Sequence, residues 1–76
     1  MKNLLEFIVN HLVEHPEDVK VDETESPDGF TYTIHVHAND MGKIIGKNGR
    51  IIQSLRTLAK VRAVKEHIRA FVNLAE

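Results

Sequence analysis

The sequence contains no cysteine, and this absence excludes disulfide bridges, zinc–thiolate sites and thiol nucleophiles. It also lacks an apolar run near the ~20 residues that a membrane-spanning helix needs. The amino terminus has no signal-peptide pattern. With 76 residues, the chain has room for one hydrophobic core. We therefore expect a single domain over residues 1–76, stabilised by packing alone and located in the cytoplasm.

Aromatic residues are also scarce, at 5% of the chain, and tryptophan is absent. Some domains bind single strands by stacking the bases on a platform of aromatic side chains. The sequence therefore does not favour a platform of that kind.

Positive and negative charges are segregated along the chain, although the formal net charge is only −1. Residues 1–30 carry eight acids against two bases, whereas residues 41–65 carry seven bases and no acid. Soluble surfaces usually mix the two signs. The basic stretch therefore favours an anionic partner over an ordinary solvated helix face. Its bases are Lys43, Lys47, Arg50, Arg56, Lys60, Arg62 and Lys65.

The periodicity of apolar residues predicts three helices and three strands. The helices are expected at 3–14, 41–45 and 50–64, and the strands at 19–25, 30–38 and 68–74. Asn3 and Glu6 resemble a capping box for the first helix. Asn39 or Asp40 should cap the second helix.

The order of these elements limits the architecture. Ser26-Pro27-Asp28-Gly29 is a turn sequence, so the first two strands should pair antiparallel as a hairpin. The last strand must join an edge of this hairpin after the chain crosses the helices. Amphipathic helices can cover the apolar face of such a sheet. The sequence thus predicts an α+β fold: a two-layer sandwich with a three-stranded sheet, three helices on one face and the order α-β-β-α-α-β.

The segment with the most chemical information joins the last two helices and reads I-I-G-K-N-G-R-I-I. Gly46 should let one helix end in a left-handed conformation, and Gly49 should let another backbone approach. The amides of Asn48, Gly49 and Arg50 should lack internal partners at the positive end of the next helix dipole. Such a site attracts phosphate. Lys47 adds a point charge, and Arg50 can bind in a bidentate manner.

A G-x-x-G pattern alone is weak evidence, because four residues with two glycines recur by chance. The simpler interpretation is a tight turn between two helices. The context favours binding, since isoleucine pairs flank the loop and the helices on both sides are basic.

The motif resembles the signature of the KH domain, a single-stranded nucleic-acid module whose GXXG loop holds about four nucleotides. The extra helix and strand before the core resemble the type II, prokaryotic arrangement. The chain is similar over nearly its whole length to the KhpA family of small bacterial one-domain KH proteins. The segments that carry this similarity are H-P-E-D-V at 15–19, N-D-M-G-K-I-I-G-K-N-G-R-I-I at 39–52 and L-R-T at 55–57.

The resemblance implies a single-stranded RNA-binding protein with an RNA-chaperone role in the bacterial cytoplasm. It also implies a homodimer, or a pair with a larger KH-containing protein of the KhpB kind, and a link to cell-wall homeostasis and cell shape. The GXXG loop would contact the RNA backbone, the apolar side chains would line a groove under the bases, and residues 34–38 would form the opposite wall. The expected RNA-binding residues are Gly46, Lys47, Asn48, Gly49, Arg50, Lys43, Ile45 and Ile52.

Metal binding and catalysis are not expected, and no cofactor is predicted. His35 and His37 could supply two metal ligands from one strand face, but no third ligand is identifiable, so a solvated face is favoured. His11, His15 and His67 are expected to form no cluster. The sequence has no Ser-His-Asp arrangement, no paired carboxylates in an apolar setting and no G-K-[ST] loop.

Two alternatives to RNA binding remain open. The domain could serve protein interaction or dimerisation with an idle groove. The ligand could also be single-stranded DNA, because phosphate contacts do not distinguish the two nucleic acids.

Overall fold

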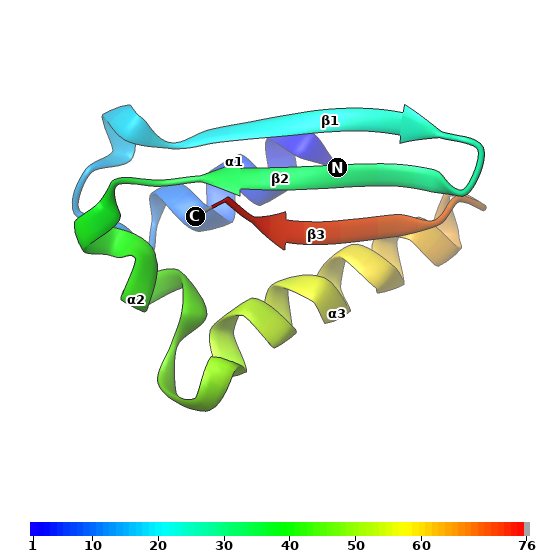
Figure 1. Ribbon diagram of the computed structural model, residues 1–76. Helices are drawn as coiled ribbons and strands as arrows, with labels where there is room; N and C mark the ends of the chain where they lie inside the picture. Colours follow the sequence, from blue (N-terminus) through cyan, green and yellow to red (C-terminus); the bar gives the residue numbers. More distant parts are fainter. Residues whose placement is uncertain (76) are drawn as a thin grey trace.

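The computed structural model describes residues 1–75 and contains the predicted elements in the predicted order (Figure 1). Short 3₁₀ turns precede β1, α2 and α3. The helices and strands are α1 (Lys2–Asn10), β1 (Lys20–Ser26), β2 (Gly29–His35), α2 (Met41–Ile45), α3 (Arg50–Lys65) and β3 (Ala70–Leu74).

The sheet has the order β1-β2-β3, with β2 in the centre. β1 and β2 form the predicted antiparallel hairpin, and β3 joins β2 in parallel after the chain has passed through α2 and α3. Gly29 is needed where β3 begins, because a Cβ there would lie 2.5 Å from the backbone oxygen of Arg69. The Phe30 amide donates to that same oxygen at 2.9 Å. The predicted crossover and α+β architecture are therefore confirmed.

The helices lie on one side of the sheet, with α2 at the end where β2 finishes (Figure 1). The core between the layers is aliphatic except for Tyr32. The hydroxyl of Tyr32 reaches out of it and donates to the Glu23 carboxylate at 3.0 Å. Burial and this hydrogen bond raise the pKa of Tyr32 to about 12, which keeps the phenol neutral. The core side chains are Leu5, Val9, Val21, Tyr32, Ile34, Ile44, Ile52, Leu55, Ala59 and Val72.

Two predicted helix details are wrong. α1 ends at Asn10 rather than at residue 14, and its N-cap residue is Met1, with no side-chain capping bond from Asn3. The early end has a local cause, because the His11 ring nitrogen bonds to the Phe7 carbonyl at 2.7 Å and the amides of residues 11 and 12 make short-range turn bonds.

The second strand also ends earlier than predicted, at His35 instead of residue 38. The chain enters a 3₁₀ turn at Ala38–Asp40, where the Asn39 amide donates to the His37 ring at 3.0 Å. Side chain-to-backbone bonds of this kind compete with strand pairing. In the part of the chain that the structure describes, no helix is both long and apolar enough to cross a membrane.

Candidate nucleic-acid interface

Gly46 ends α2 in a backbone conformation that residues with a side chain rarely adopt. Its φ of 75° and ψ of 174° lie in a region that is essentially restricted to glycine. A Cβ at this position would lie 2.6 Å from a side-chain carbon of Ile51. The positive φ agrees with the prediction, but the extended ψ differs from a left-handed helix cap. Gly46 therefore allows the chain to leave α2 sharply while Ile51 packs against it.

The next three residues form a 3₁₀ turn, Lys47–Gly49, that leads into α3. Asn48 and Gly49 both have left-handed backbone angles, with φ of 56° and 73°. The prediction that three amides lack internal partners is wrong for two of them. The Gly49 amide donates to the Gly46 carbonyl at 3.2 Å, and the Arg50 amide donates to the Lys47 carbonyl. The tight turn itself uses the Gly49 and Arg50 amides. Of the three amides that were predicted to lack a partner, the Asn48 amide remains as the candidate donor to an anion.

The two glycines of the loop differ in the space around them. A Cβ on Gly49 would meet nothing within 4 Å. Lys47 and Asn48 are exposed, and so is Arg50 at the start of α3. Among residues 1–75, neither Lys47 nor Arg50 forms a salt bridge. The outer half of the loop is therefore open to a ligand and carries two uncompensated positive charges.

Lys43 differs from these two cations because it pairs with the carboxylate of Glu14. The hydrogen bond and the charge of Lys43 lower the pKa of Glu14. Both side chains are well exposed to solvent, so the interaction is weak and screened by salt. Lys43 is thus near the loop but already faces an intramolecular anion.

The two predicted apolar contacts have different surroundings. Ile45 is 40% exposed beside the loop, whereas Ile52 is 8% exposed and belongs to the core. Ile45 therefore exposes apolar surface beside the loop, and Ile52 exposes very little.

The prediction that Ile34 helps to form the opposite wall of the groove is wrong. This residue is fully buried, and β2 lies between the other two strands. The strand next to α3 is β3, and the Arg56 Nε atom donates to the Val72 carbonyl across this seam at 3.0 Å. Sequence reasoning included Arg56 in the basic stretch but did not identify this bridge, because no local pattern specifies a partner 16 residues away.

Asp40 fixes the position of α2 from its other end. Its side chain is 1% exposed, and its two carboxylate oxygens accept the amides of Glu14 and His15 at 3.1 and 3.0 Å. Burial opposes its ionisation, but these amides and the nearby positive charge hold the pKa of Asp40 below its ordinary value. Asp40 is the N-cap residue of α2, as one of the two predicted candidates, but its side chain makes no capping bond, because the carboxylate binds the distant segment after α1.

The histidines are also arranged differently from the prediction. His37 lies past the end of β2 rather than on the strand beside His35, and its ring stacks on that of His15 with centroids 4.1 Å apart. His35 instead bonds to the Asp22 carboxylate at 2.8 Å. Burial opposes the ionisation of Asp22, but His35 and Lys20 lower its pKa. Within residues 1–75, no three potential ligands are placed to hold a metal ion.

Comparisons with known proteins agree with this geometry. The profile described as "KhpA/KhpB, KH domain" matches residues 2–74. A protein named RNA-binding protein KhpA from Clostridium perfringens is 42% identical over 97% of this chain and 99% of its own length. Its namesake from Halalkalibacterium halodurans is 38% identical over the full length of both chains. The namesake from Chlamydia pneumoniae is 37% identical over all of this chain and 97% of its own. No solved structure gave a significant match.

Proposed function

Because the chain belongs to the KhpA/KhpB family of KH domains, we propose that it binds single-stranded RNA through the loop at residues 46–49. The observation that carries this proposal is the geometry of the loop. Gly46 turns the chain out of α2, and Gly49 leaves open space in front of α3. The names of the relatives support the choice of RNA as the ligand.

The backbone of the RNA is held by position and charge. A phosphate next to the Asn48 amide lies at the positive end of the α3 dipole. Lys47 and Arg50 add charges that no carboxylate of residues 1–75 neutralises. These contacts fix the register of the strand and carry no sequence information. The bases are read beyond the loop, where the exposed Ile45 side chain offers an apolar contact.

The test is a double substitution at the tip of the loop, Lys47→Asp with Asn48→Asp. The matched control, Lys65→Asp with Asn73→Asp, makes the same chemical changes at two other exposed positions. We expect the loop variant to lose binding of a short unpaired RNA in fluorescence anisotropy, while the control binds like wild type. Both variants should keep the wild-type circular dichroism spectrum. Equal affinity of the loop variant and wild type would overturn the proposal.

Salt dependence provides a second measurement. If two to four phosphates are neutralised, log K should fall against log salt with a slope of about −1.5 to −3 for a single strand. A slope near zero would show that the basic loop does not contact phosphate.

We further propose that the protein is an RNA chaperone of the bacterial cytoplasm, without enzyme activity, and acts as a homodimer or with a larger KH-containing partner. Its role would lie in post-transcriptional regulation linked to the cell wall and cell shape. The family membership supports this role. Support for self-association comes from α3, where Leu58 and Val61 are 48% and 55% exposed. Val61→Asp should reduce the mass measured by sedimentation if these side chains pair two copies.

The second candidate function is a dimerisation module whose groove holds no nucleic acid. The contact between Lys43 and Glu14 favours this alternative, because it removes one cation from the loop region. RNA binding and dimerisation alone are distinguished by one result. If the protein dimerises but binds neither RNA nor single-stranded DNA, it is a dimerisation module.

A further inference from the structure

The short helix α2 has little buried surface of its own to hold it in place. Of its five residues, Met41–Ile45, only Ile44 has a buried side chain. Isolated helices of this length are not stable in water, so contacts with the rest of the chain must fix the position of α2. The loop at residues 46–49 follows α2 directly. The orientation of α2 therefore decides where the loop lies.

Three contacts connect the region around the start of α2 to the segment after α1, and all of them reach Glu14 or His15. The Asp40 carboxylate accepts both of their amides, at 3.1 and 3.0 Å. The His15 ring stacks on the ring of His37, and the Glu14 carboxylate pairs with Lys43. One short segment of the chain thus holds the helix that leads into the loop.

Asp40 makes the one contact of the three in which a charge is withdrawn from water. Its side chain is 1% exposed, and among residues 1–75 no other charged residue is buried. The pair of Glu14 with Lys43 is well exposed and therefore contributes little. A buried carboxylate is costly unless hydrogen bonds satisfy it. If α2 moved away from the segment after α1, Asp40 would lose both of its amide partners.

We propose that Asp40 is a positioning residue for RNA binding, which couples residues 14 and 15 energetically to the loop at residues 46–49. The inference rests on the proposed function, because it names a distant contact on which the affinity of that loop depends. While Asp40 holds the two amides, α2 keeps the loop and the exposed Ile45 side chain in the arrangement that receives RNA. When this contact opens, the affinity falls. Such coupling is reciprocal, so bound RNA also holds the contact closed.

The first test compares RNA affinity in variants that conserve the shape of a buried side chain. Asp40→Asn can accept one of the two amides but presents its own NH₂ group to the other. The control Tyr32→Phe removes one hydrogen bond, to Glu23 in the sheet. A randomised pool of octamer RNA is titrated by fluorescence anisotropy at a temperature where thermal unfolding shows each protein to be folded. We expect Asp40→Asn to bind about tenfold more weakly than wild type, within the usual range of coupling between sites, and Tyr32→Phe to bind like wild type.

Glu14→Gln separates the buried contact from the exposed ion pair. Asp40 accepts the backbone amide of Glu14, so this variant keeps that bond and loses the pair with Lys43. Its RNA affinity should equal or exceed that of wild type, since the substitution releases a cation near the loop. If Glu14→Gln loses as much affinity as Asp40→Asn, the ion pair is responsible and the inference is overturned.

Hydrogen exchange tests the coupling in wild type, without any substitution. The amides of Glu14 and His15 lie outside the helices and strands, so they exchange when their bonds to Asp40 open locally. A saturating amount of the octamer pool should slow their exchange about tenfold. Because coupling is reciprocal, this factor should match the loss of affinity in Asp40→Asn.

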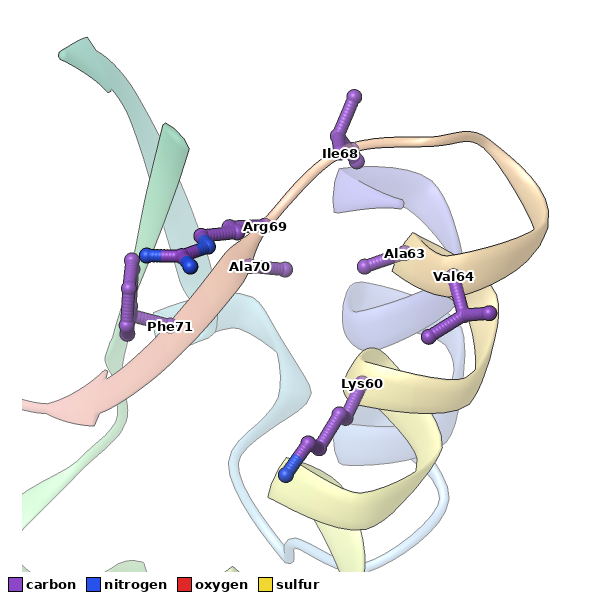
Figure 2. Close-up of a pocket in the computed structure, with 7 residues that line it drawn as sticks. All are labelled: Lys60, Ala63, Val64, Ile68, Arg69, Ala70 and Phe71. Atoms are coloured by element: carbon purple, nitrogen blue, oxygen red, sulfur yellow. The ribbon is translucent and has the colours of Figure 1, made fainter. Parts of the chain in front are cut away.

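The reference for this measurement lies at the opposite end of α3, where the chain turns back toward β3 (Figure 2). There the Ile68 amide donates to the Ala63 carbonyl at 2.9 Å, beside a hollow of about 440 Å³. This amide is also outside the helices and strands, but it has no connection to Asp40. Its exchange should not change when RNA binds.

The outcomes separate this inference from the proposed function. If Asp40→Asn binds RNA like wild type, or if RNA leaves the exchange of residues 14 and 15 unchanged, the inference is overturned and binding at the loop stays intact. An equal loss of affinity in Tyr32→Phe would also overturn it, because the cause would then be lower stability. If Asp40→Asn does not fold, the exchange measurement on wild type decides. If wild type binds no RNA, the proposed function fails, and the inference fails with it.

Discussion

Gly46 and Gly49 occupy the two ends of the same motif and both have positive φ, but they meet different surroundings. A Cβ on Gly46 would strike Ile51, whereas a Cβ on Gly49 would enter open space. The first glycine is therefore required by the packing of the protein, and the second leaves room for something outside it. This contrast separates residues that hold the loop from residues that are available to a ligand.

The largest effect is expected for Gly46→Ala. The backbone strain alone is of order 1–3 kcal/mol, and the overlap with Ile51 adds to it. We expect the free energy of unfolding to fall by about 3 kcal/mol or more, which corresponds to a Tm decrease of about 12 °C or more in a domain of this size. Urea and thermal unfolding measure both quantities. A loss below 1 kcal/mol would remove the distinction between the two glycines.

Asp40→Asn tests the other end of α2 and should have the next largest effect. The folded-state pKa of Asp40 is lowered, so its ionised form contributes stability above the ordinary carboxyl pKa of about 3.9. That contribution is lost as the pH falls through the folded-state pKa. The urea midpoint of the variant should therefore lie below that of wild type at pH 7, and the two should converge below about pH 4. A constant difference down to pH 2.5 would contradict this assignment.

Gly49→Ala should affect stability less and binding more. A left-handed alanine costs roughly 1–2 kcal/mol, with no overlap to add to it. The methyl group would occupy the space in front of α3 where we place the RNA backbone. RNA affinity should fall about tenfold, measured at a temperature where the variant is fully folded. Unchanged affinity would mean that no backbone approaches this glycine.

The smallest effect is expected for Asn48→Gly. Asparagine tolerates left-handed angles better than most residues, and glycine would relieve the remaining strain while making the unfolded chain more flexible. These effects oppose one another, so the free energy of unfolding should change by less than ~0.5 kcal/mol. Chemical denaturation of the variant beside wild type checks this value. A larger loss would indicate that the Asn48 side chain supports the loop.

The sequence predicted the elements and their order because both follow from local periodicity and turn residues. The hairpin turn and the paired glycines are local signals of this kind. The role of Asp40 could not be predicted in this way, since its partners lie 25 and 26 residues earlier in the chain. A polar residue before a helix resembles a cap whether or not its side chain turns toward another segment.

The sequence predicted which residues form the candidate site better than it predicted the contacts that these residues make. The pattern located the loop, but the i to i+3 bonds that use the Gly49 and Arg50 amides depend on the exact turn geometry. The burial of Ile52 and of Ile34 depends on how helices and strands meet, which their spacing does not specify. The bridge from Arg56 to β3 requires the crossover to be known first.

The hydrogen bond from Arg56 to the Val72 carbonyl also affects how the edge of the sheet meets other protein molecules. An edge strand with open carbonyl groups invites a strand from another molecule to extend the sheet. On β3, Arg56 already occupies the Val72 carbonyl. On the other edge, β1 carries Asp22, Glu23 and Glu25, whose like charges repel a second copy. Each edge of the small sheet thus carries a feature that disfavours the addition of a further strand.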